Sequence, residues 1–77
     1  MPHVHIKHFP HDFTDEQKQR LAEAVTAVVV DHFGTYDGAV SIALEPVAAD
    51  DWAEAVTVPE VQGRAHLLIK EPNYRTR

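Results

Sequence analysis

The chain opens with the stretch MPHVHIKHF, residues 1–9. In this stretch Val4 and Ile6 alternate with polar side chains, and a period of two is typical of a half-buried β-strand. Pro2 stands at the head of the strand, where its missing N–H removes no hydrogen bond from a sheet. We therefore predict a strand headed by Pro2.

Pro2 also suggests chemistry. If Met1 is removed after synthesis, Pro2 becomes a secondary amine held at the tip of a strand. An ordinary α-amino group has a pKa of about 7.7–8.0, and desolvation or a nearby cation lowers that pKa further. Such a base suits proton abstraction next to a carbonyl group. Met-Pro is also simply how some chains begin, so these two residues alone leave both interpretations open.

Size and composition limit the remaining possibilities. A chain of 77 residues, 1–77, is expected to form a single domain. It contains no cysteine, which excludes disulfides, a thiolate nucleophile and cysteine-ligated metal sites. A domain of this size buries only about 60% of the surface that its unfolded chain exposes. Without covalent cross-links, oligomerisation is the expected source of further buried surface.

Charge and hydropathy indicate the kind of partner. Twelve acidic residues against seven Lys and Arg give a formal net charge of −5, whereas a nucleic-acid binder normally presents a basic face. No apolar run is long enough to span a membrane, and the N-terminal residues lack the pattern of a signal peptide. We therefore expect a soluble cytoplasmic protein that binds neither nucleic acid nor membranes.

The segment after the first strand predicts a helix over residues 15–33. Thr14 and Gln17 have the spacing of a capping box, and Gly34 is suited to the left-handed position that follows a helix. Residues that recur at helical spacing predict one face turned toward a core. This stripe comprises Leu21, Val25, Val28, Val29 and His32.

A second strand is predicted over residues 39–45 and is closed by Pro46. Two strands joined by a helix of this length form a parallel β-α-β unit. Because two strands make a poor sheet alone, a second subunit that extends the sheet to four strands is expected. The fold class is α/β (α+β), with the helices of the dimer on one face of the sheet.

The C-terminal part is predicted to be helical. A short helical turn is expected within residues 48–55, which include Trp52, the only tryptophan. Val58-Pro59 is typical of a helix entry with proline at its first position, so a second helix is predicted from about Pro59 to Lys70. Residues Arg75–Arg77 are predicted to be a mobile tail.

Taken in order, these features resemble the 4-oxalocrotonate tautomerase superfamily, and most closely its dimeric phenylpyruvate-tautomerase-like branch. The likeness covers nearly the whole chain. The matching residues are Pro2, Thr14-Asp15-Glu16-Gln17-Lys18, Ser41-Ile42-Ala43-Leu44, Trp52, Leu68-Ile69-Lys70, Pro72 and Tyr74.

The resemblance implies a tautomerase-like subunit whose Met1 is removed and whose Pro2 acts as a general base. It implies interconversion of the enol and keto forms of a small 2-oxo acid, with active sites near the interface of a homodimer. It also implies neither a metal nor an organic cofactor.

Two positions depart from the best-known members of the superfamily. Those members carry an arginine just before the helix cap, where this chain has Phe13, and another in the second strand, where it has Ser41. Arginine suits the bidentate binding of carboxylates. Their absence favours a smaller apolar or aromatic monocarboxylate over a dicarboxylate. Trp52 occupies the position of an aromatic residue that walls the pocket in the larger family, and it could lower the pKa of Pro2 by desolvation.

Each of these residues also has a structural interpretation. Trp52 can be a core or interface residue, Ser41 a solvated strand serine, and Phe13 a hydrophobic staple before the helix cap. The histidines near the N-terminus, His3 and His5 among them, also permit a zinc or copper site, although no third ligand is convincingly spaced. If Met1 is retained, the alternative is a non-enzymatic protein of the same fold that binds a small molecule or another protein. Lys7, Arg64 and Lys70 are the candidates to replace the missing arginines.

Overall fold

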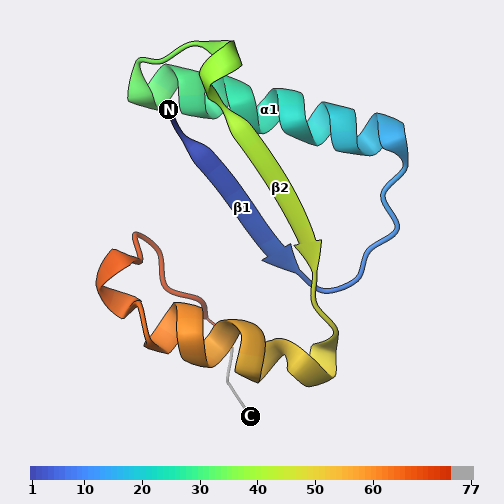
Figure 1. The fold of residues 1–77 in the computed structure, drawn as a ribbon, viewed down its shortest axis with the longest axis vertical. Coiled ribbons are helices and arrows are strands. Elements are labelled where there is room, and N and C mark those ends of the chain that lie inside the picture. The colour runs from blue at the N-terminus through green and yellow to red at the C-terminus, as the bar shows by residue number, and fades with distance from the viewer. Residues whose placement is uncertain (74–77) are drawn as a thin grey trace.

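Two parallel strands lie between two helical segments (Figure 1). The computed structural model describes residues 1–73, so the predicted tail at Arg75–Arg77 lies outside the described residues. Strand β1 spans His3–His8 and strand β2 spans Ser41–Pro46. They pair in parallel, in a register that runs from His3 opposite Ser41 to His8 opposite Pro46. The predicted β-α-β unit is confirmed, and the second strand begins two residues later than expected.

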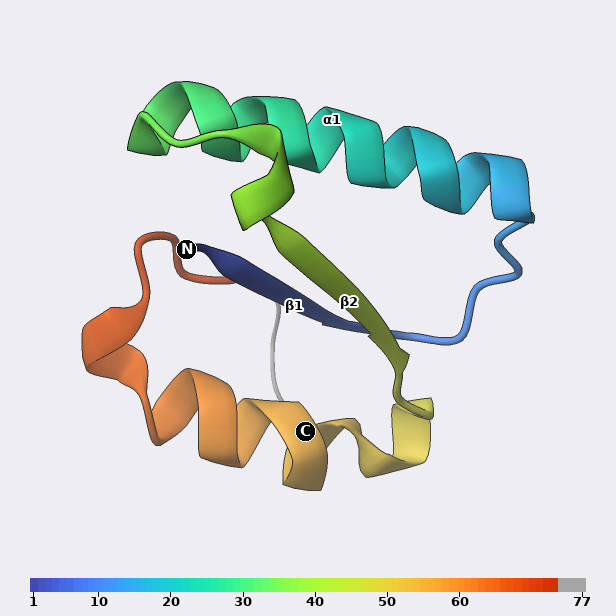
Figure 2. The ribbon, with the colours of Figure 1, turned by 45° about the horizontal axis from the view of Figure 1, so that its top comes forward.

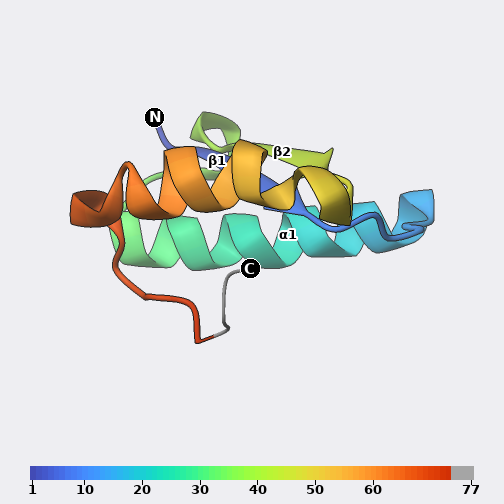
Figure 3. The ribbon, with the colours of Figure 1, turned by 90° about the horizontal axis from the view of Figure 1, so that it is seen from below.

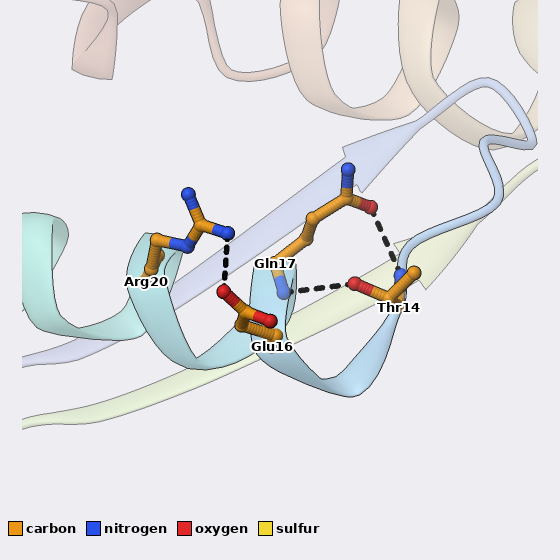
Figure 4. A network of polar contacts seen from close by, with 4 residues as sticks. All are labelled: Thr14, Glu16, Gln17 and Arg20. Carbon is orange, nitrogen blue, oxygen red and sulfur yellow. Dashed lines mark hydrogen bonds and ion pairs between the residues drawn. The ribbon is translucent and has the colours of Figure 1, made fainter.

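Helix α1 spans Asp15–Phe33, as predicted, and its ends have the expected caps. The Thr14 hydroxyl accepts a hydrogen bond from the Gln17 amide at 3.1 Å, and the Gln17 side chain accepts one from the Thr14 amide at 2.9 Å (Figure 4). These two bonds satisfy amides that would otherwise lack partners at the start of the helix. Gly34 ends the helix with a φ of 63°, in the left-handed region that favours glycine.

The two faces of the sheet differ in polarity. Val4 and Ile6 alternate with polar residues along β1, and the register places Ile42 and Leu44 of β2 beside them. Ile42 and Leu44 line an open groove beneath α1, with a volume of about 310 Å³, together with Lys18, Leu21 and Ala22. The apolar face of the sheet is therefore the one that α1 covers.

Few apolar side chains within residues 1–73 are buried. Those of the described residues that are buried are Val29, Ala39, Val47 and Val56. Two members of the predicted helix stripe depart from expectation, because Val28 remains 58% exposed and His32 is also exposed. No helix within residues 1–73 is long and apolar enough to cross a membrane.

The predicted helix from Pro59 to Lys70 is wrong. After a short turn at Ala49–Asp51 (η2), the helical segment η3 spans Ala53–Gln62 and contains Pro59 in its interior. A further short turn, η4, spans Ala65–Leu67.

The backbone of η3 explains this difference. It has the wide π-helical form, and the Gly63 amide closes it by donating to the Val58 carbonyl, five residues earlier, at 2.8 Å. Pro59 has no N–H and donates no bond in a helical ladder of either width, so η3 contains it as a missing bond and is closed by the Gly63 amide after it. Leu68 then has an extended backbone, so the predicted helix does not continue to Lys70. The Ile69 side chain, predicted to be part of the apolar stripe of that helix, is fully exposed.

Segment η3 lies on the opposite side of the sheet from α1, with its axis roughly parallel to that of α1 (Figures 2 and 3). The Lys7 ammonium, on the polar side of β1, donates to the Ala55 carbonyl of η3 at 3.3 Å. The prediction of helices on one face is therefore wrong for the C-terminal segment. The period of β1 shows that its two faces differ, but it does not show which later segment covers the second face.

Candidate active site

Pro2 and Ser41 lie side by side at the N-terminal ends of the two strands. The Ser41 amide donates to the Pro2 carbonyl at 3.2 Å, a bond that extends the parallel ladder by one step. Pro2 is half-buried, Ser41 is exposed, and Met1 is 97% exposed. The β-α-β connection thus brings together two predicted site residues that are 39 positions apart in the sequence.

His3 joins this pair. Its Nδ1 atom lies 2.6 Å from the Ser41 hydroxyl oxygen, across the first paired position of the sheet. The sequence pattern suggests for His3 only a role as a metal ligand. Its position directly after Pro2, combined with the parallel register, is the signal that would have identified this contact.

Phe13 and Trp52 lie at the other end of the strands. The Trp52 ring packs edge-to-face on Phe9, directly after β1, with ring centroids 4.9 Å apart. The Phe13 ring is 5.8 Å from the ring of His8 and 4.5 Å from that of His11. Both rings are half-buried in aromatic contacts near the C-terminal end of β1.

The four predicted site residues therefore form two separate groups in the chain. Strand β1 has six residues, and a strand of this length spans roughly 17–20 Å. Pro2 and Ser41 lie at one end of that distance, and Phe13 and Trp52 lie at the other. One chain alone does not bring all four into a common pocket.

Comparisons with known proteins agree along nearly the whole chain. A family model described as tautomerase enzyme matches residues 2–62. The chain belongs to the tautomerase family. It is 45% identical to tautomerase PptA of Enterobacter sp. (strain 638), over 96% of this chain and 97% of that protein. The proteins of the same name from Klebsiella pneumoniae (strain 342) and Escherichia coli O139:H28 are 46% and 36% identical over the same shares.

The family assignment confirms the resemblance found in the sequence and the β-α-β fold that it implied. It also supports an enzyme of the isomerase class with tautomerase activity. The roles of individual residues in this tautomerase rest on the geometry of its own chain.

Lys7, Arg64 and Lys70 are the predicted candidates to replace the missing arginines. Lys7 lies toward the far end of β1, where its ammonium contacts the Ala55 carbonyl. Arg64 and Lys70 are exposed and lie beyond the end of η3. Lys7 thus has a partner in η3, and the roles of Arg64 and Lys70 stay predictions.

The histidines of the polar sheet face have other partners. His3 contacts Ser41, and the His5 Nε2 atom lies 2.8 Å from a carboxylate oxygen of Glu45. In the part of the chain that the structure describes, no three His, Cys, Asp or Glu side chains are placed to hold a metal ion. The paired histidines are thus engaged in contacts between the two strands.

Proposed function

We propose that this tautomerase interconverts the enol and keto forms of a small apolar or aromatic 2-oxo acid. In this proposal Met1 is removed and the free Pro2 amine acts as the general base. The observation that carries the proposal is the position of Pro2. Pro2 is half-buried at the head of β1, its carbonyl accepts a hydrogen bond from the Ser41 amide of β2, and the residue before it, Met1, is exposed.

The proposed reaction moves one proton and needs no cofactor. In the ketonisation direction, the Pro2 nitrogen takes the proton from the enol hydroxyl, and the resulting ammonium returns a proton to the adjacent carbon. The electrons of the O–H bond form the C=O bond, and those of the C=C bond form the new C–H bond. A secondary amine with a pKa near the working pH can serve as both acceptor and donor.

The side chains of the other three predicted site residues favour a monocarboxylate substrate. Phe13 and Ser41 stand where the best-known members of the superfamily have arginines, so this chain lacks two groups suited to a second carboxylate. Ser41 offers a single hydroxyl, which can donate one hydrogen bond to an oxygen of the substrate. Phe13 and Trp52 offer apolar walls, which favour an apolar or aromatic substituent.

A homodimer would unite the two groups of site residues. A two-fold axis that pairs the sheets antiparallel brings the Pro2 end of one subunit to the Trp52 end of the other. The site would then combine Pro2 and Ser41 of one subunit with Phe13 and Trp52 of the second. The open groove beneath α1 and the two-stranded sheet also leave apolar surface that a second subunit could cover.

The first test combines intact mass with activity. We expect the untagged protein to lack Met1 and to ketonise the enol of phenylpyruvate. We expect Pro2→Ala to lower kcat about 10²–10⁴-fold, the range of a general base, without changing the circular dichroism spectrum. Retention of Met1 in an active protein, or full activity of Pro2→Ala, would refute the role of Pro2. Sedimentation tests the dimer separately, and a folded, active monomer at micromolar concentration would exclude the shared site.

A further inference from the structure

On the polar face of the sheet, two histidines of β1 each contact a polar residue of β2. His3 contacts Ser41, and His5 contacts Glu45; in each pair, one strand supplies the imidazole and the other its partner. Only the His3 pair includes a residue that is bonded to Pro2, through the Ser41 amide and the Pro2 carbonyl. The His3–Ser41 pair therefore lies at the candidate site, and the His5–Glu45 pair does not contact Pro2.

We propose that His3 is a positioning residue that fixes the Ser41 hydroxyl as a hydrogen-bond donor toward the carbonyl oxygen of the substrate. This inference rests on the proposed function and adds a residue to the same site. It concerns the 2.6 Å contact between the His3 Nδ1 atom and the Ser41 oxygen.

The Ser41 hydroxyl has only one hydrogen to donate. A serine hydroxyl donates one hydrogen bond and accepts up to two, while each imidazole nitrogen either donates or accepts. When the His3 Nδ1 carries a hydrogen, that N–H donates to the Ser41 oxygen, and the Ser41 hydrogen must point elsewhere. The opposite tautomer would take up the Ser41 hydrogen and leave no donor for a substrate.

A substrate oxygen selects the first of these arrangements. Negative charge develops on the carbonyl oxygen as the adjacent C–H bond breaks, and a donor held in place lowers the energy of that state. The Ser41 hydroxyl then donates to the oxygen, and the His3 N–H donates to the hydroxyl. The chain of two hydrogen bonds polarises the hydroxyl. No net proton leaves either residue, and the transferred proton stays with Pro2 and the substrate.

His3 lies on a face with several other ionisable groups. On β1 these are His5 and Lys7, on β2 Glu45, and the segment η3 that crosses this face carries Glu54 and Glu60. Glu45 contacts His5, and Lys7 contacts the Ala55 carbonyl. In the described residues, the Ser41 hydroxyl is thus the polar partner assigned to the His3 imidazole.

The kinetic test uses a double-mutant cycle. We expect His3→Phe to lower kcat for phenylpyruvate ketonisation about tenfold with little change in KM, because the interaction forms mainly in the transition state. In a Ser41→Ala background the same change should have almost no further effect. His3→Asn should restore activity to within about threefold, because its side-chain amide can donate in place of Nδ1. His5→Phe is the matched control and should keep wild-type kcat.

Equal losses in both backgrounds, or equal losses for His3→Phe and His5→Phe, would overturn the positioning role. A second measurement separates this inference from the proposed function. We would follow the His3 imidazole by ¹⁵N NMR while adding a monocarboxylate analogue, cinnamate. The shift of Nδ1 toward its protonated position should occur in the wild type and be lost in Ser41→Ala.

If the wild type has no tautomerase activity, the proposed function fails, and the NMR titration alone decides the inference. The positioning role would be overturned by an Nδ1 signal that does not shift when cinnamate is added. It would also be overturned by a signal that shifts equally in the wild type and in Ser41→Ala.

Discussion

Replacing Gly63 with alanine should destabilise the protein, because the chain passes very close to itself at this residue. A Cβ atom at Gly63 would lie 2.7 Å from the Pro59 carbonyl oxygen and 3.0 Å from that of Val58. Both obstacles are backbone atoms, so neither can move aside by a side-chain rotation. The backbone angles of Gly63, φ −68° and ψ −22°, are allowed for alanine. The effect of the substitution is therefore steric.

The size of the effect follows from two opposed contributions. Forcing an extra carbon into such a contact costs about 1–3 kcal/mol. Alanine recovers up to about 1 kcal/mol, because it restricts the unfolded chain more than glycine does. We expect a net loss of about 1–2 kcal/mol in the free energy of unfolding. In a domain of this size, each kcal/mol lowers Tm by about 4–8 °C, so Tm should fall by roughly 5–15 °C.

Gly38→Ala is the matched control. A Cβ atom at Gly38 would meet only the Tyr36 ring, at 3.6 Å, which is an ordinary contact. This variant should be as stable as the wild type or slightly more stable. Thermal unfolding of all three proteins at one protein concentration makes the comparison, since dimerisation would make Tm depend on concentration. A Gly63→Ala variant as stable as Gly38→Ala would refute the steric reasoning.

Three further variants test other parts of the structure. Thr57→Val should raise the free energy of unfolding by about 1 kcal/mol in urea titrations, because Thr57 is 2% exposed and its buried hydroxyl has no hydrogen-bond partner among residues 1–73. A clear loss of stability would contradict this. Thr14→Ala should lower it by about 1 kcal/mol, because it removes the capping box of α1; unchanged stability would show that the cap contributes nothing. Trp52→Ala should raise KM for phenylpyruvate about 2–10-fold, which corresponds to the free energy of an aromatic contact. The control Phe33→Ala removes a ring that is 71% exposed and should leave KM unchanged. Equal effects of the two substitutions on KM would exclude Trp52 from the pocket.

Local sequence signals determined the elements that depend on neighbouring residues. The capping box at Thr14 and the left-handed Gly34 bound α1 at the predicted residues, because helix ends are set by hydrogen bonds and backbone angles within a few positions. The alternation in residues 3–8 likewise predicted β1, because the side chains of a strand alternate between its faces. The sequence pattern also identified the family, and the comparisons confirmed it.

Tertiary structure alone decided where the site residues meet. The contact between His3 and Ser41 depends on the register of two strands that are far apart in the sequence. The C-terminal segment differed for a related reason: Pro59 is typical of a helix start, yet it lies inside η3, whose bounds its neighbouring residues did not indicate. The separation of Pro2 from Trp52 follows from the direction of the parallel strands, since one precedes β1 and the other follows β2. Such placements depend on contacts between distant segments, and local patterns along the chain do not predict those contacts.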